Sequence, residues 1–140
     1  MSVYLDTSVM VSLFTKDDFS SRADAALRAR PVVQLVSDFG AAEFASAVAR
    51  RFRMRDMTEK ETALAFADFD HWRANVATHV VLESADIVAA EAIVRRLDLM
   101  LRAPDAIHLA ITRRIGAELA TFDEKMAVSA RALGLPLAAV

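Results

Sequence analysis

Short apolar runs alternate along this chain with longer helix-forming segments, and that alternation most constrains the fold. Runs of apolar and β-branched residues predict strands at residues 3–5, 32–36, 79–82 and 118–122. The segments between them are long enough for helices, which parallel strands need as crossover connections. We therefore expect an α/β fold with a parallel sheet that is covered by helices on both faces.

Capping and breaking residues set the expected helix limits. Ser20 or Ser21 is expected to cap a helix that runs to about residue 30, where Pro31 stops it. Thr58 and Glu61 fit a capping box at the start of a helix that ends near residue 75. Further helices are expected for about two turns after residue 8 and over residues 41–54, 84–97, 104–115 and 124–133.

Three positions in the second half of the chain carry similar signals for the start or the end of a helix. Ser84 is expected to cap the helix that it begins. In APDAIHLAITRRIG, Pro104 suits the first helical position and Gly116 suits the stop. The final segment LPLAAV could add an edge strand.

The composition favours a single domain over residues 1–140, because this length leaves little room for a second one. The chain lacks cysteine, which excludes disulfides and thiolate zinc sites and is compatible with a reducing cytoplasm. We expect a cytoplasmic protein with no membrane segment, because the opening residues lack a basic signal region and no apolar stretch approaches roughly 20 residues. With a net charge of −2, nucleic-acid binding would depend on local basic surface or on bound metal.

Four acidic residues occupy positions that a parallel sheet would bring together. Asp6 and Asp123 each follow a predicted strand, and ligands of open α/β sheets bind beyond the carboxyl ends of strands. Glu43 and Asp105 are expected in the first turns of helices that begin on the same rim. Each acid also has a structural interpretation, because acids are favoured at helix starts. Asp6, directly after a buried strand, fits that interpretation least well.

Convergence of these carboxylates would be costly without a cation. Two like charges about 4 Å apart repel by roughly 1 kcal/mol in water and by several-fold more near protein. An oxygen-only donor set suits Mg²⁺ or Mn²⁺, whereas the lack of cysteine and of a paired-histidine motif argues against zinc. The residues therefore favour a divalent-metal site.

At four places the chain resembles PIN domains, and among them the VapC-type toxins of bacterial toxin–antitoxin pairs. The matching pieces, which occur in the family's order and spacing, are YLDTSVM at 4–10, AAEFASA at 41–47, LRAPDAIHLA at 101–110 and LATFD at 119–123. The resemblance implies that Asp6, Glu43, Asp105 and Asp123 form the acidic quartet. It also implies that three polar residues support the quartet, namely Thr7, Ser8 and Thr121.

The same resemblance implies a three-layer α/β/α sandwich with a mostly parallel sheet, and endoribonuclease activity with Mg²⁺ or Mn²⁺. The implied partners are RNA, a small antitoxin protein and a second copy of the chain in a homodimer. If two ions bind, a metal-activated water would leave a 5′-phosphate and a 3′-hydroxyl. Asp6, Asp105 and Asp123 would be direct ligands, and Glu43 would bind a second ion or orient the water.

Other residues admit two interpretations. His108 lies on the face of Asp105 and could orient a ligand, although packing is the simpler account. The basic run Arg50–Arg55 could bind RNA or the antitoxin, or could be a solvated helix end. Phe66, Phe69 and Trp72 are expected in the core or a dimer contact rather than stacked on bases.

Two other functions compete with the nuclease. A phosphohydrolase on a similar sheet would need a second aspartate two residues after Asp6, where this chain has Ser8. A non-catalytic binding module of PIN-like fold would keep the acids only for structure. Metal binding would separate these alternatives.

Overall fold

The fold is built on a parallel sheet of short strands. A computed structural model describes residues 1–29 and 31–140. In these residues the sheet has four strands in the order β3-β2-β1-β4, and each neighbouring pair is parallel. The strands are β1 (Ser2–Leu5), β2 (Val33–Ser37), β3 (Thr78–Val80) and β4 (Glu118–Ala120). The expected parallel sheet is confirmed.

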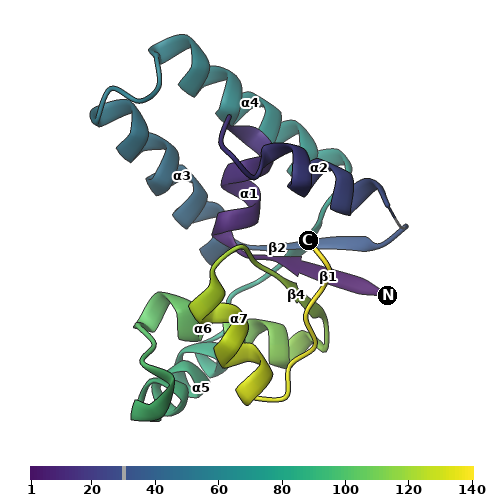
Figure 1. Cartoon of the computed structure of the whole chain (residues 1–140), viewed down its shortest axis with the longest axis vertical. Coiled ribbons are helices and arrows are strands. Elements are labelled where there is room, and N and C mark those ends of the chain that lie inside the picture. The colour runs from purple at the N-terminus through teal and green to yellow at the C-terminus, as the bar shows by residue number, and fades with distance from the viewer. Residues whose placement is uncertain (30) are drawn as a thin grey trace.

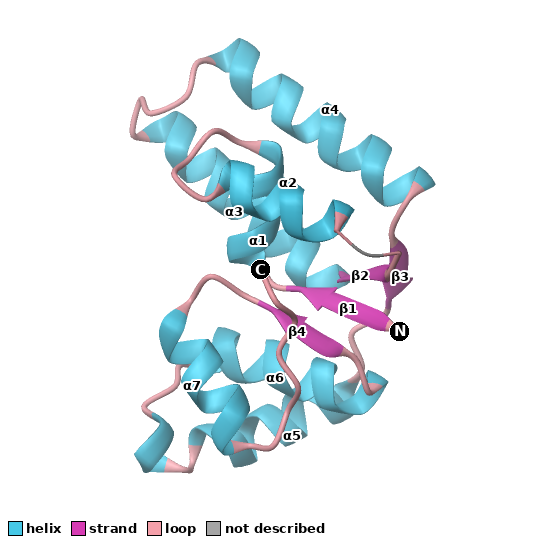
Figure 2. Cartoon of the chain, turned by 45° about the vertical axis from the view of Figure 1, so that its right-hand side comes forward, coloured by secondary structure: helices cyan, strands magenta, loops and turns pink. Residues whose placement is uncertain are grey.

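Helices cover the sheet on both faces, which confirms the three-layer α/β/α sandwich (Figures 1 and 2). One layer contains α1 (Thr7–Phe14), α2 (Ser20–Arg28), α3 (Asp38–Arg53) and α4 (Glu59–Asn75). The other contains α5 (Ser84–Val94), α6 (Ala103–Ile115) and α7 (Glu124–Ala132), with a short 3-10 turn, η1 (Leu97–Leu99), between α5 and α6. No helix in the described residues is both long and apolar enough to cross a membrane.

Strand β1 divides its side chains between the two cores. Val3 and Leu5 point into the core under α1–α4, whereas Tyr4 joins the core against α5–α7. This follows from the two-residue period of a strand that is buried on both faces. Asp6, the next residue, lies directly after the end of this buried strand and is itself buried.

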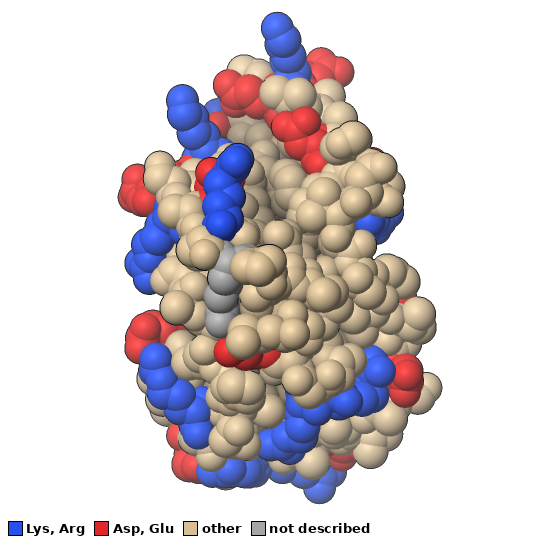
Figure 3. Space-filling model, turned by 90° about the vertical axis from the view of Figure 1, so that its right-hand side faces the viewer, with Lys and Arg blue, Asp and Glu red and all other residues tan. Residues whose placement is uncertain are grey.

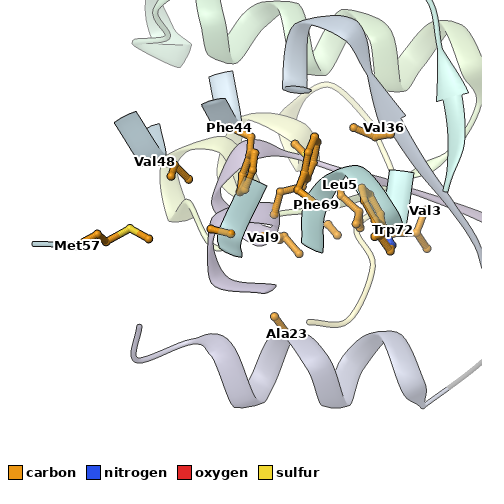
Figure 4. Close-up of a cluster of buried hydrophobic side chains, with 13 residues drawn as sticks. Val3, Leu5, Val9, Ala23, Val36, Phe44, Val48, Met57, Phe69 and Trp72 are labelled. Atoms are coloured by element: carbon orange, nitrogen blue, oxygen red, sulfur yellow. The ribbon is translucent and has the colours of Figure 1, made fainter. Parts of the chain in front are cut away.

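Phe44 of α3 and Phe69 and Trp72 of α4 lie in the first of these cores (Figure 4). The rings of Phe44 and Phe69 stack with centroids 4.2 Å apart, and Trp72 packs beside Phe69 at 5.7 Å. Trp72 also donates from Nε1 to the Gln34 side chain at 2.8 Å, which supplies the polar partner a buried indole needs. The expectation that Phe66, Phe69 and Trp72 pack rather than bind bases is confirmed for the core.

The start of α3 differs from the expectation. The strand before it continues to Ser37, and the helix begins at Asp38 rather than after Gly40. The Ser37 side chain caps the helix by accepting from the Gly40 amide at 2.9 Å, so Gly40 lies inside the first turn. Glu43 is consequently in the second turn of α3, and its assignment to a first turn was wrong.

Three other expected helix starts were also wrong. Phe19, not a serine, is the residue before α2, while the Ser20 hydroxyl donates to the Thr15 carbonyl at 2.9 Å. Glu83 precedes α5 in place of Ser84, because its amide donates to the Asp86 carboxylate at 2.9 Å in a capping box.

In α6 the proline takes the second rather than the first helical position, because the helix begins at Ala103. Gly116 ends that helix with φ 65°, and the capping box of Thr58 with Glu61 is present, so both of those expectations are confirmed.

The last expected strands are shorter than their apolar runs. The third is Thr78–Val80 instead of 79–82, and the fourth stops at Ala120. The final segment adds only an isolated parallel bridge between Leu137 and Leu119. Helix α5 ends at Val94 before η1, and the expected end of the second helix at residue 30 lies outside the described residues.

Candidate metal and nuclease site

A cavity of about 480 Å³ opens where β1 and β4 end, at the carboxyl edge of the sheet. All four sequence-predicted acids line it, although they come from widely separated segments. Its polar lining residues are Asp6, Thr7, Ser8, Ser12, Asp17, Glu43, Asp105, His108 and Asp123. The topology therefore brings the predicted quartet to one cavity.

Asp6 is the most deeply placed of the acids, with only 2% of its surface exposed. It precedes α1 and caps that helix, because Oδ1 accepts from the Val9 amide at 3.1 Å. Burial raises the pKa of the Asp6 carboxyl above its ordinary value, while the hydroxyls of Ser8 and Thr121 and the Val9 amide oppose the rise. A carboxylate here needs those donors or a cation for stability.

Two predicted supporting residues hold Asp6 directly. Ser8 donates to Oδ1 at 2.6 Å, and Thr121 donates to Oδ2 at 2.5 Å. Each hydroxyl also accepts a backbone amide from the loop after β4: Phe122 donates to Ser8 at 2.9 Å, and Asp123 donates to Thr121 at 3.0 Å. The ends of β1 and β4 are thus joined through Asp6.

Glu43 faces the cavity from α3 and is held from two sides. Thr7, the third supporting residue, donates to Glu43 Oε1 at 2.8 Å, and His108 Nε2 makes a short contact with the same oxygen. Burial raises the pKa of the Glu43 carboxyl, but the hydrogen bonds from His108 and Thr7 outweigh it, with help from the positive charge of Arg102. The pKa therefore lies below its ordinary value, and Glu43 is held as a carboxylate.

His108 is a buried polar residue with a partner on each ring nitrogen. Its Nδ1 bonds to the Tyr4 hydroxyl at 2.8 Å, and Tyr4 bonds in turn to the Ser37 hydroxyl at 2.7 Å. These contacts fix the plane of the imidazole and aim Nε2 at Glu43. The expectation that His108 is a packing residue accounts for its burial but not for its hydrogen bonds to Tyr4 and Glu43. The available signal was its position three residues after Asp105, on the same face of α6.

Asp105 and Asp123 lie nearer the surface and also serve their helices. Asp105 accepts from the Arg102 amide at 3.3 Å at the start of α6, with 20% of its side chain exposed. Asp123 caps α7 by accepting from the Met126 amide at 3.1 Å. The structural and functional interpretations of these acids are both compatible with the contacts.

Asp17 is a cavity residue that the sequence did not indicate. It lies in the loop between α1 and α2, where it accepts from the Ser12 hydroxyl at 2.8 Å and from the Phe19 amide at 2.8 Å. A single acid in a polar loop carries no periodic or capping signal that distinguishes it from a solvated one. Only the three-dimensional path of the loop brings it to the cavity.

The donor set fits a hard divalent cation by its chemistry. Every acidic side chain at the cavity supplies carboxylate oxygen, which Mg²⁺ and Mn²⁺ prefer. Among the described residues, however, no three acids or histidines stand close enough to form a ready-made metal cluster. Binding would therefore draw in side chains such as Asp105 and Asp123, which are only partly buried or exposed.

The chain belongs to the PIN domain family, whose sequence profile matches residues 3–132. No curated protein sequence matches it. VapC20 of Mycobacterium tuberculosis, a toxin that cleaves the sarcin–ricin loop, superposes with a TM-score of 0.73 at 21% identity, over 91% of this chain and 95% of that one.

Two further solved structures have the same fold. VapBC2 of Rickettsia felis, bound to a promoter DNA fragment, matches with a TM-score of 0.70 at 17% identity, over 98% of this chain and 97% of that one. FitAcB of Neisseria gonorrhoeae matches with a TM-score of 0.66 at 16% identity, over 96% and 95%. At these identities the likeness shows a shared fold.

Proposed function

We propose that this chain is a divalent-metal-dependent endoribonuclease and the toxin of a toxin–antitoxin pair. The observation that carries the proposal is the cavity at the carboxyl edge of the sheet, lined by Asp6, Glu43, Asp105 and Asp123 in a chain of the PIN domain family. VapC20, of the same fold, is a toxin that cleaves the sarcin–ricin loop, and a toxin–antitoxin complex from Klebsiella pneumoniae also has this fold. We extend an RNA substrate and an antitoxin partner to this chain on that basis.

We assign each residue a role in the proposed reaction from its surroundings in the cavity. Asp6, Asp105 and Asp123 would hold Mg²⁺ or Mn²⁺, which would activate the attacking water and stabilise the leaving oxygen. Ser8 and Thr121 fix the Asp6 carboxylate from both sides. Oδ1 already accepts from Ser8 and from the Val9 amide, whereas Oδ2 accepts only from Thr121 among the described residues. Since a carboxylate oxygen has two lone pairs, Oδ2 keeps one for a cation.

Glu43 has a different task in this proposal. His108 and Thr7 occupy Oε1, so the carboxylate has a fixed direction toward the cavity. A carboxylate held ionised in this way can accept a proton from a water or bind a second ion. The buried Tyr4–His108 contact keeps the orientation of this group independent of solvent.

The basic run Arg50–Arg55 offers a surface for RNA or antitoxin. Arg51 is tied back to the loop after α1, where it donates to the Thr15 hydroxyl at 2.6 Å. Arg50 and Arg53 lie in the last turn of α3 with Arg51. Basic side chains also gather on the lower part of the face at the amino ends of the strands (Figure 3). We propose that RNA or antitoxin binds at the end of α3, because this helix also carries Glu43.

We also propose that the protein is a homodimer and acts in the cytoplasm.

The first test is RNA cleavage with Mg²⁺, with Mn²⁺ and with a chelator, followed by sequencing of the cut ends. We expect metal-dependent cuts that leave 5′-phosphates. Asp6→Asn should abolish cleavage and keep the fold, because the amide retains the capping oxygen while one buried negative charge is removed. Circular dichroism and thermal denaturation check the fold. Cleavage by Asp6→Asn at the wild-type rate would refute the assignment.

A non-catalytic module of PIN fold is the second candidate. It is favoured by the capping contacts of Asp105 and Asp123 and by the lack of a ready-made cation cluster in the described residues. Calorimetry with Mn²⁺ separates the two functions. Saturable binding that Asp6→Asn weakens supports the nuclease, and heats no larger than dilution support the module.

A further inference from the structure

Two aromatic rings stand at the rim of the acidic cavity. Phe19, at the start of α2, and Phe122, in the loop after β4, both line the cavity. Their rings stack with centroids 4.8 Å apart and planes 22° from parallel. Phe19 is 41% exposed, so part of its ring surface is open to a ligand.

A guanidinium group accompanies the pair. The Arg22 carbon Cζ lies 5.3 Å from the Phe122 ring centroid and 5.8 Å from that of Phe19. The Val140 backbone oxygen accepts from Arg22 Nη2 at 2.7 Å, which holds the side chain in place. The rim therefore combines flat apolar faces with a positive charge beside a cavity lined by acids.

Both rings are positioned by polar contacts that lead to the acidic site. The Phe19 amide donates to Asp17, and the Asp17 side chain also accepts from Ser12. The Phe122 amide donates to Ser8, whose hydroxyl donates to Asp6. Rings that are fixed before a ligand arrives lose less conformational entropy on stacking.

Core sealing explains only one of the two rings. Phe122 is half-buried and packs against the core under α1–α4. Phe19 lies outside both core clusters of the described residues, and its stacking partner is Phe122. An exposed ring that rests on a fixed ring presents a surface suited to a further planar group.

From this arrangement we propose that Phe19 and Phe122, with Arg22, form a stacking platform for one unpaired RNA base beside the cleaved phosphate. The proposal rests on the nuclease function and names its substrate class. In a duplex each base face is covered by its neighbours, so the platform selects single-stranded or looped RNA. Aromatic stacking tolerates every base, and the guanidinium favours the adjoining phosphate.

Steady-state cleavage of a single-stranded RNA tests the platform through variants of one residue. Phe19→Ala and Phe19→Leu should each raise KM by about 5- to 150-fold, the range for losing one base–aromatic stack. Phe19→Trp should keep KM near the wild-type value. Leucine is the matched control, because it keeps apolar cover and loses the aromatic face. Wild-type KM in Phe19→Leu would overturn the proposal.

An RNA lacking a single base provides a second, independent readout. Wild type should lose affinity when the base at one position flanking the cut is removed, whereas Phe19→Leu should lose nothing further. Additive losses from the two changes would overturn the proposal, because the ring and the base would then act separately.

A binding arm separates failure of the platform from failure of the nuclease. If wild type cuts no RNA with Mg²⁺ or Mn²⁺, the proposed function is refuted. The platform is then judged with single-stranded RNA that contains 2-aminopurine, with Ca²⁺ as the cation. Fluorescence quenching by wild type that Phe19→Leu abolishes supports the platform, and equal signals from both proteins overturn it.

Discussion

Arg114 links α5 to α6, two helices that pack extensively against each other in the layer of α5–α7. Its removal should weaken the fold without changing a residue of the site. Its guanidinium donates to both carboxylate oxygens of Asp86, at 2.7 and 2.9 Å. It also donates to Glu83 at 3.1 Å and to the Val81 carbonyl at 2.9 Å. Arg114 thereby ties the start of α5 to α6, the helix that carries Asp105 and His108.

The magnitude of the loss follows from burial. Asp86 is only 1% exposed, so Arg114→Met leaves a buried carboxylate without its cation, which typically costs about 3–5 kcal/mol. The arginine itself is 29% exposed, so we reduce the expected loss to about 2–4 kcal/mol. The unfolding entropy of a chain this size is roughly 0.3 kcal/mol per kelvin, which makes the fall in Tm about 7–14 °C.

Thermal and urea denaturation of three variants measure this effect. Arg113→Met is the matched control, because the neighbouring arginine makes only a 3.4 Å contact with the Leu133 carbonyl among its described contacts. Asp86→Asn combined with Arg114→Met should recover at least half of the lost stability, since no buried charge remains. The side-chain amide that replaces the carboxylate keeps an oxygen that can accept from the Glu83 backbone, as Asp86 does.

The pH dependence gives the sign of the same interaction. Burial raises the pKa of Asp86, but the hydrogen bonds from Arg114 and the Glu83 amide outweigh it and leave the pKa below its ordinary value. The stabilisation is therefore present above the unfolded-state pKa and is lost as the pH falls through the folded one. The difference between wild type and Arg114→Met should shrink in acid. An Arg114→Met Tm within 2 °C of that of Arg113→Met at neutral pH, about the effect of a surface change, would refute the reasoning.

Two further predictions concern the site and a helix end. His108→Phe keeps a ring of similar size but leaves Glu43 without its nitrogen donor, so cleavage should fall by about 10- to 100-fold, as for other residues that orient a ligand. Cleavage rates and Mn²⁺ calorimetry check it, and an unchanged rate would contradict the role of His108. Gly116→Ala should lower the free energy of unfolding by about 1–2 kcal/mol, because φ is 65° there and an alanine is strained in that region. Urea denaturation checks it, and an unchanged midpoint would contradict the strain.

The layer order and the site edge were predictable because they depend on simple periodicities. Buried runs that end at Asp6 and Asp123 determined which edge of the sheet would carry the acids. Glu43 reached the same cavity although its turn of the helix was predicted wrongly. One turn of α-helix is about 5.4 Å long, so its face mattered more than its distance from the helix start.

The contacts that fix the site could not be derived from local sequence patterns, because they join side chains distant in sequence. The support that Thr121 gives to the acids was expected only from the resemblance to PIN domains. His108 and Tyr4 are 104 positions apart, and Thr121 and Asp6 are 115 apart. Neither pair has a local pattern. Ser37 showed the same limit on a smaller scale: its hydroxyl caps α3 and also bonds to Tyr4, and no propensity rule distinguishes such a serine from one in a turn.

The proposed metal ligands can cap helices and bind a cation at the same time. The repulsion between these carboxylates is therefore smaller than their charges alone would give. Asp6, Asp105 and Asp123 each lie at a helix start and accept a hydrogen bond from a backbone amide there. The positive end of a helix stabilises a nearby carboxylate by about 0.3–1 kcal/mol, and by more where it is partly buried. Three helix starts therefore offset part of the repulsion before any cation arrives. The chain can consequently fold with its acids in place, and the proposed metal ion would complete the charge balance of the cavity.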